Sequence, residues 1–205
     1  MEENSKDAYR AAAGIVQFQP MSLSLQSLRL ALVRYATRRA TKLEGSRPHA
    51  AEWWLRLACR LAPTFDFVHR DLVAHMRHSD DRLGAVKVAE EAIRRFGDSP
   101  DAWMLLGECY VAAYKPRDAL AAFENVLVIE ERPAAALAAG ELYARLGDHV
   151  TAGARYARAY AAGAGPDALK LNALALQSAG DGKAAAQARM LWERETGKKW
   201  GDTAS

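Results

Sequence analysis

The chain has 205 residues, half of them hydrophobic and about a quarter charged, with a net charge of +3. This length is typical of one domain, and the composition is that of an ordinary globular protein rather than a disordered or fibrous chain. No stretch approaches the roughly 20 apolar residues that a membrane-spanning helix requires. About a fifth of the residues are Ala, the best helix former, and β-branched residues are few, so we expect an all-α fold.

Residues 1–20 form a separate N-terminal segment in our interpretation. Residues 5–18 have the pattern of an amphipathic helix that Pro20 ends, and we expect this segment to be flexible or bound to a partner. The chain opens with Glu2 and Glu3 instead of the positive charge and apolar run of a secretion signal. We therefore expect the protein to be cytoplasmic.

A long helix is predicted from about residue 22 to residue 43, and this part of the chain is strongly basic. Only Glu44 opposes its six cations, which are Arg29, Arg34, Arg38, Arg39, Lys42 and Arg47. Such a cluster is compatible with binding to nucleic acid or to acidic lipid. It is also compatible with docking to an acidic protein surface, or with a charged outer face whose Arg stems cover apolar surface.

Nine shorter helices are predicted after residue 43 from apolar residues at three- and four-residue steps. They are expected near residues 49–62, 66–78, 82–96, 100–113, 117–130, 133–146, 149–162, 167–179 and 183–196. The remaining residues, 200–205, are expected to be a flexible tail.

A sharp motif begins at Pro100 and alternates large and small residues at fixed positions. It reads W-x2-L-G-x2-Y and then A-x3-F, with Trp103, Leu106, Gly107, Tyr110, Ala119 and Phe123. The first four residues share one helix face. Gly107 and Ala119 are small, so two antiparallel helices can cross closely there, and Phe123 fills the space beside the crossing.

The same scheme recurs along the chain every 33 or 34 residues. The sites equivalent to Ala119 are Ala51, Ala85, Ala152 and Ala185. Gly140, Tyr143 and Tyr156 repeat Gly107, Tyr110 and Phe123 in the next unit, whereas Arg38 and Arg39 stand at the Leu and Gly positions of the first. This pattern resembles the tetratricopeptide repeat (TPR) family.

The resemblance implies a right-handed superhelical stack of about five antiparallel helix pairs, an α-solenoid, over residues 21–199. We place the units at about 32–65, 66–99, 100–132, 133–165 and 166–199. It also implies that a partner segment binds along the concave surface made by the first helix of each pair. By the family's register, this surface carries Arg70, Arg77, Met104, Glu108, Val111, Leu137, Glu141, Lys170 and Leu174.

No catalytic motif or cofactor-binding motif is found in the sequence. His75 and His78 stand three residues apart, which suits a metal, but no acidic or sulfur ligand nearby completes a set. We expect no metal, no cofactor and no enzymatic activity. Cys59 and Cys109 lack metal-ligand spacing and are interpreted as reduced core residues rather than a disulfide.

The last predicted helix carries the apolar run Met190, Leu191 and Trp192. A repeat array usually ends with a polar capping helix, so this end is expected either to bind a partner or second copy, or to be closed by Trp200. The predicted function is that of a protein-binding adaptor or assembly scaffold. The alternative is binding of nucleic acid or acidic membrane through the basic first hairpin.

Overall fold

The computed structural model describes residues 24–62, 64 and 67–203. The described residues form ten α-helices and one short 3-10 helix, and they contain no strand. The helices are α2 (Leu25–Leu43), α3 (Pro48–Leu61), α4 (Phe67–His78), α5 (Arg82–Arg95), α6 (Pro100–Ala112), α7 (Pro116–Ile129), α8 (Pro133–Arg145), α9 (His149–Ala161), α10 (Asp167–Ser178), α11 (Gly182–Thr196) and η1 (Trp200–Thr203). The helix that we predicted over residues 5–18 lies outside the described residues.

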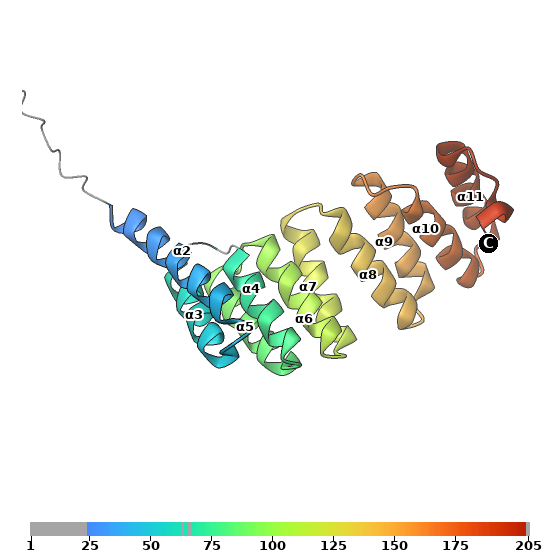
Figure 1. The fold of residues 1–205 in the computed structure, drawn as a ribbon. Coiled ribbons are helices and arrows are strands. Elements are labelled where there is room, and N and C mark those ends of the chain that lie inside the picture. Colours follow the sequence, from blue (N-terminus) through green and yellow to red (C-terminus); the bar gives the residue numbers. More distant parts are fainter. Residues whose placement is uncertain (1–23, 63, 65–66, 204–205) are drawn as a thin grey trace, which may run out of the picture.

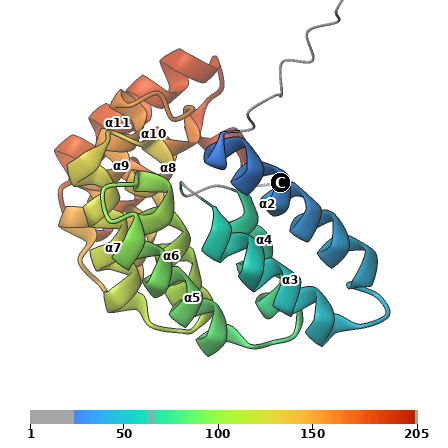
Figure 2. The same cartoon turned by 90° about the vertical axis from the view of Figure 1, so that its left-hand side faces the viewer.

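The helices stack in chain order as five antiparallel pairs, so that each helix packs mainly on its neighbours in the sequence. Figure 1 shows the resulting elongated, curved rod, which runs from α2 at one end to α11 at the other. The view in Figure 2 looks along the rod and shows successive pairs offset from one another. The predicted all-α solenoid of five helix pairs is confirmed.

The Ala residues that recur every 33 or 34 positions all occupy the fourth position of a second helix. Ala51, Ala85, Ala119, Ala152 and Ala185 are at most 2 % exposed. In each case the backbone N–H donates to the carbonyl of the residue that precedes the helix, at about 3.0 Å. Because a buried Ala side chain lets two helices pack closely, the repeat period in the sequence corresponds to a repeated buried contact.

Gly107 and Gly140 are required by the aromatic rings of the helices opposite them. A Cβ atom on Gly107 would lie 2.5 Å from Phe123 Cε1, and one on Gly140 would lie 2.7 Å from Tyr156 Cε1. Both distances are far below van der Waals contact. The second hairpin has Val73 and Ala89 at the positions of Gly107 and Phe123, and all of these residues are buried. In the second hairpin the larger side chain of the pair, Val73, is therefore on the first helix, whereas in the third hairpin the larger one, Phe123, is on the second helix.

The turns inside the hairpins from α4 to α11 each have three residues, and the middle one has a positive φ angle. Gly147 and Gly180 adopt this conformation easily, but Asp80 and Tyr114 also adopt it, with φ of 56° and 58°. An L residue other than Gly is strained there. Three of these turns end on an Asp whose carboxylate accepts a backbone N–H of the following helix. The bond from Thr151 holds the pKa of Asp148 below its usual value.

The first hairpin departs from the predicted register. Arg38 and Arg39, which we had placed at the Leu and Gly positions of the helix contact, are exposed. Ala36 and Ala40 are buried instead, in the same cluster as Leu55 of α3. The reason is the turn, which has four residues (44–47) where the other hairpins have three. One extra residue changes a helix's rotation relative to its partner by about 100°.

The C-terminal end is closed by its own aromatic residues. The ring centroids of Trp192 and Trp200 lie 5.4 Å apart, edge to face. The backbone N–H of Trp200 donates to Glu193 Oε1 at 2.8 Å. Residues 200–203 form η1 and pack on α11, because the large Trp200 ring contacts an apolar partner there. The flexible tail that we predicted over residues 200–205 stays a prediction for residues 204 and 205, which lie outside the described residues.

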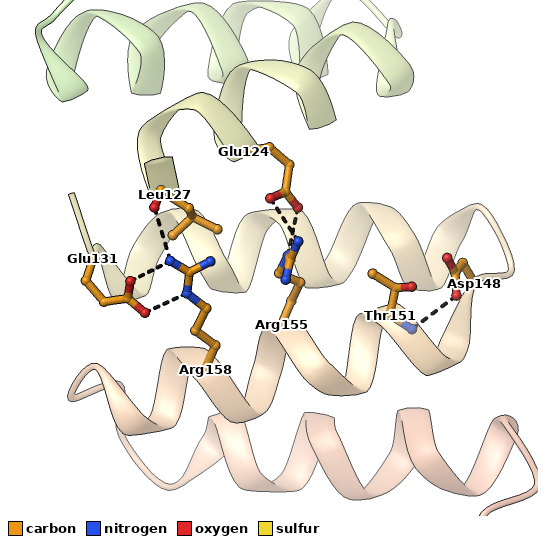
Figure 3. A network of polar contacts seen from close by, with 7 residues as sticks. All are labelled: Glu124, Leu127, Glu131, Asp148, Thr151, Arg155 and Arg158. Carbon is orange, nitrogen blue, oxygen red and sulfur yellow. Dashed lines mark hydrogen bonds and ion pairs between the residues drawn. The ribbon is translucent and has the colours of Figure 1, made fainter. Parts of the chain in front are cut away.

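Two arginines of α9 tie the third and fourth hairpins together. Figure 3 shows Arg155 and Arg158 pointing from α9 toward α7. Arg155 donates to both oxygens of Glu124 at 2.7 and 2.9 Å. Arg158 binds Glu131 and also donates to the Leu127 carbonyl at 3.1 Å, and it holds the pKa of Glu131 below its usual value. Such paired bonds fix the relative orientation of the two hairpins.

Candidate partner-binding groove

A hollow of about 340 Å³ opens between the first helices of the second, third and fourth hairpins. Five of the residues that line it were predicted for the groove: Arg77 of α4, Met104, Glu108 and Val111 of α6, and Glu141 of α8. The three α6 residues are spaced by four and three positions, so they share one face of the helix. Glu141 stands 33 residues after Glu108, and the solenoid therefore places the two acids on successive first helices.

The floor of the hollow is apolar and its walls are charged. Phe123 and Leu142 are 2 % and 4 % exposed at its base. Its charged lining residues are two acids, Glu108 and Glu141, and two arginines, Arg77 and Arg145. Among the described residues, none of these four charged side chains has an opposite charge within 4.0 Å. Their charges are thus available to a guest in a partly enclosed space, where water screens them less than at an open surface.

Four predicted groove residues do not line this hollow. Arg70 forms an ion pair with Asp101 at 3.4 Å, and Asp101 also binds Arg132 at 2.6 Å. Leu137 is half-buried and packs against two core clusters. Lys170 and Leu174 lie on α10, beyond the hollow, and Leu174 is 44 % exposed. These residues could contact only a guest that extends along the rod.

The arrangement is similar to that of known solved structures. The crystal structure of MamA has 15 % sequence identity and a TM-score of 0.66, covering 85 % of this chain and 97 % of that one. YrrB, described as a TPR protein with an unusual peptide-binding site, has 15 % identity and a TM-score of 0.60, covering 80 % of this chain and 86 % of that one.

A thermophilic TPR protein of Thermus thermophilus has 20 % identity and a TM-score of 0.53, covering 81 % of this chain and 92 % of that one. The chain has the tetratricopeptide-repeat fold. At these identities the likeness concerns the fold alone. No protein-family model and no curated protein sequence matches the chain.

Within this TPR fold, the sequence analysis missed several residues that line the hollow. They are Ala112, Phe123, Ala138, Leu142 and Arg145. Arg145 follows Glu141 by four residues, so the helical period could have indicated it. Phe123 and Leu142 were assigned to the core or left aside, because sequence spacing cannot show that a core residue is also the floor of a hollow.

The six basic residues of the first hairpin lie at the N-terminal end of the TPR array and are all exposed. No carboxylate lies within 4.0 Å of any of them in the described part of the chain. Arg39 lies 6.0 Å from the ring centroid of Trp54, so its side chain partly covers an aromatic surface. Binding of nucleic acid or acidic lipid by these residues stays a prediction.

The side chains that we considered for chemistry are dispersed. His75 is buried with Nδ1 3.8 Å from Glu44 Oε1, and His78 is exposed. No group of three potential metal ligands occurs among residues 24–62, 64 and 67–203. Cys59 and Cys109 are both buried, and no disulfide links them in the described part of the chain. Burial raises the pKa of Cys109 to about 12, so this thiol stays protonated at neutral pH.

The last helix keeps part of its apolar surface open. Met190 is 62 % exposed and, with Gln187, Leu191 and Arg194, borders a shallow hollow, whereas Trp192 is buried. Self-association through this helix stays a prediction. No helix in the described residues is long and apolar enough to cross a membrane.

Proposed function

We propose that this protein is a non-catalytic interaction module that holds a segment of a partner protein in the hollow between α4, α6 and α8. The observation that carries the proposal is the pair of acids, Glu108 and Glu141, which stand over an apolar floor with no cation within 4.0 Å among the described residues. The peptide-binding site named for YrrB is a precedent on the same fold. Such a module acts as an adaptor or as a peripheral subunit of a larger assembly.

The lining of the hollow indicates what kind of segment would fit. An apolar side chain of the guest would pack against Met104, Val111 and Leu142, and a neighbouring Lys or Arg would meet the two acids. A carboxylate next to Glu108 and Glu141 would be repelled, whereas Arg77 and Arg145, which also line the hollow, would attract one. We therefore propose an extended or helical guest with a cationic residue beside an apolar one. The buried, reduced thiols fit the cytoplasmic setting that we expect.

Charge reversal in the hollow tests the proposal. Glu108→Lys and Glu141→Lys, singly and together, would place a cation against the guest's cation, and we expect recovery of the partner from native cells to fall at least about tenfold, equivalent to about 1.4 kcal/mol. Glu91→Lys is the matched control, because Glu91 is an exposed acid of α5 outside the hollow. Captured proteins are quantified by mass spectrometry after the variants are shown to keep their helical content. Unchanged recovery with the double variant would refute the groove assignment.

A further inference from the structure

An apolar stripe runs along the exposed side of α2 at the N-terminal end of the array. Leu25, Leu28, Leu32 and Tyr35 recur at three- and four-residue steps, so they share one face. Their exposed fractions are 83 %, 47 %, 45 % and 53 %. The face of α2 that packs most closely on α3 is a different one, formed by Val33, Ala36 and Ala40, and lies about a quarter turn away around the helix axis. Only Tyr35 of the stripe has a ring contact with α3, edge to face with Trp54 at a centroid distance of 5.7 Å among the described residues.

The stripe occupies a position that is filled in the other hairpins. The first helices α4, α6, α8 and α10 each pack on the second helix of the preceding hairpin as well as on their own partner. On α6, for example, Leu106 and Cys109 share a core cluster with residues of α4 and α5. The stripe of α2 lies on the corresponding flank. Figures 1 and 2 show α2 at the outer edge of the array, with α3 as its neighbour.

We infer that the N-terminal segment of this same chain, residues 8–18, covers the stripe as an antiparallel helix. Its apolar residues Ala8, Ala11, Ile15 and Phe18 have the spacing of the stripe in reverse order. With residues 19–24 as the connection, Phe18 falls opposite Leu25, Ile15 opposite Leu28, Ala11 opposite Leu32 and Ala8 opposite Tyr35. The small residues meet the large ones at the far end, which allows the two helices to interdigitate.

The connection is suited to such a hairpin. Pro20 prevents the first helix from continuing past residue 19. Ser24 begins the second, because its side chain accepts the backbone N–H of Ser27 at 3.1 Å. Six residues lie between the two helices, close to the five that connect α3 to α4 and α9 to α10. No long loop is needed to return the segment to α2.

The charge of α2 favours the N-terminal segment as the covering helix and disfavours the α2 helix of a second copy. From residue 24 to residue 43 the chain has five cations, Arg29, Arg34, Arg38, Arg39 and Lys42, and no acid. Two such helices pressed together would repel each other. The N-terminal segment instead begins with Glu2 and Glu3, which an antiparallel arrangement brings beside Arg38, Arg39 and Lys42. Residues 1–20 also carry Asp7, Lys6 and Arg10, so the segment has a net charge of −1 against +5 on α2. It therefore complements α2 in shape and, at its acidic start, in charge.

Disulfide trapping in the full-length chain tests the register. Ala11→Cys with Leu32→Cys places two thiols opposite each other, and we expect an intramolecular disulfide to form under mild oxidation at low micromolar protein. The control pair is Ala13→Cys with Leu32→Cys, because residue 13 lies about 200° around the helix from residue 11. We expect the first pair to oxidise at least about tenfold faster. Equal rates, or a disulfide-linked dimer, would overturn the inference.

Amide hydrogen exchange gives a second readout that does not depend on cysteine chemistry. We expect residues 8–18 to exchange at least about tenfold more slowly than an unstructured chain. Leu32→Asp, in the stripe, should abolish this protection. Leu30→Asp should preserve it, because Leu30 is similarly exposed at 42 % but lies outside the stripe. Full-rate exchange in the unmodified protein, or an identical effect of both variants, would contradict the intramolecular helix.

Discussion

The third hairpin and the first hairpin solve the same packing problem in different ways. In the third, Gly107 lets α6 approach the ring of Phe123, and the turn between the helices has three residues. In the first, the turn has four residues, and Ala36 and Ala40 face α3 in place of the residue that the period indicates. Both hairpins bury small residues where their helices meet.

This difference shows which feature the fold requires. The close approach of two helices needs a small residue on one side of the crossing, but it does not need that residue at a fixed position. The second hairpin makes the same point, because Val73 and Ala89 reverse the order of small and large side chains. The fold limits the combined volume of the two side chains that meet at the helix crossing. The length of the turn determines which residues stand at that crossing.

The largest effect on stability is expected when the Gly107 and Phe123 pair of the third hairpin is replaced by the Val and Ala pair of the second hairpin. Phe123→Ala removes a fully buried ring and is expected to cost about 4 kcal/mol. Gly107→Val places a side chain against that ring and should cost about 3 kcal/mol. The double variant reproduces the pair of the second hairpin, so it should be more stable than the two losses predict, by about 2 kcal/mol. Urea unfolding followed by circular dichroism measures all three; simple additivity would show that the positions are not coupled.

A smaller effect of opposite sign is expected in the fifth hairpin, where Asn172 stands at the Leu position of the repeat. The residue is buried, and its Oδ1 has no hydrogen-bond partner among the described residues. An unsatisfied buried polar atom costs about 1–3 kcal/mol, so Asn172→Leu should raise the free energy of unfolding by about 1–2 kcal/mol.

Asn125→Leu is the control for this change, because the Asn125 side chain donates to the Ala121 carbonyl at 3.0 Å. It should give no gain. If Asn172→Leu lowers the unfolding temperature, the Asn172 side chain stabilises the fifth hairpin. The fifth hairpin would then not follow the packing rule of the third, which has Leu106 at this repeat position.

The smallest effect is expected at the turn of the third hairpin. Tyr114 has a φ of 58°, where the fourth hairpin has Gly147 with a φ of 84°. Tyr114→Gly removes the backbone strain but also the contact between the Arg82 guanidinium and the Tyr114 ring at 5.2 Å. The net gain should be about 0.5 kcal/mol. The reciprocal change Gly147→Ala should cost about 1 kcal/mol in thermal unfolding, and a gain there would contradict the strain argument.

The sequence predicted the groove less completely than the fold. Helical period and repeat register indicated Met104, Glu108 and Glu141, since these depend only on which helix face is concave. They could not show that Asp101 engages Arg70, or that Leu137 packs into the core while Ala138 lines the hollow. Those outcomes depend on small rotations between successive hairpins, which no single repeat encodes.

The sequence by itself determined that the chain forms helices, that they pair every 33 or 34 residues, and where the helices of the third and fourth hairpins come closest. Local propensity and small residues suffice for this, because each hairpin contacts only its neighbours. The tertiary structure alone decided how α2 turns against α3, how Trp200 closes the end on Trp192, and which charged side chains share one hollow. These features depend on distances between residues of different helices, and such distances are fixed only when the stacked pairs adopt a common curvature.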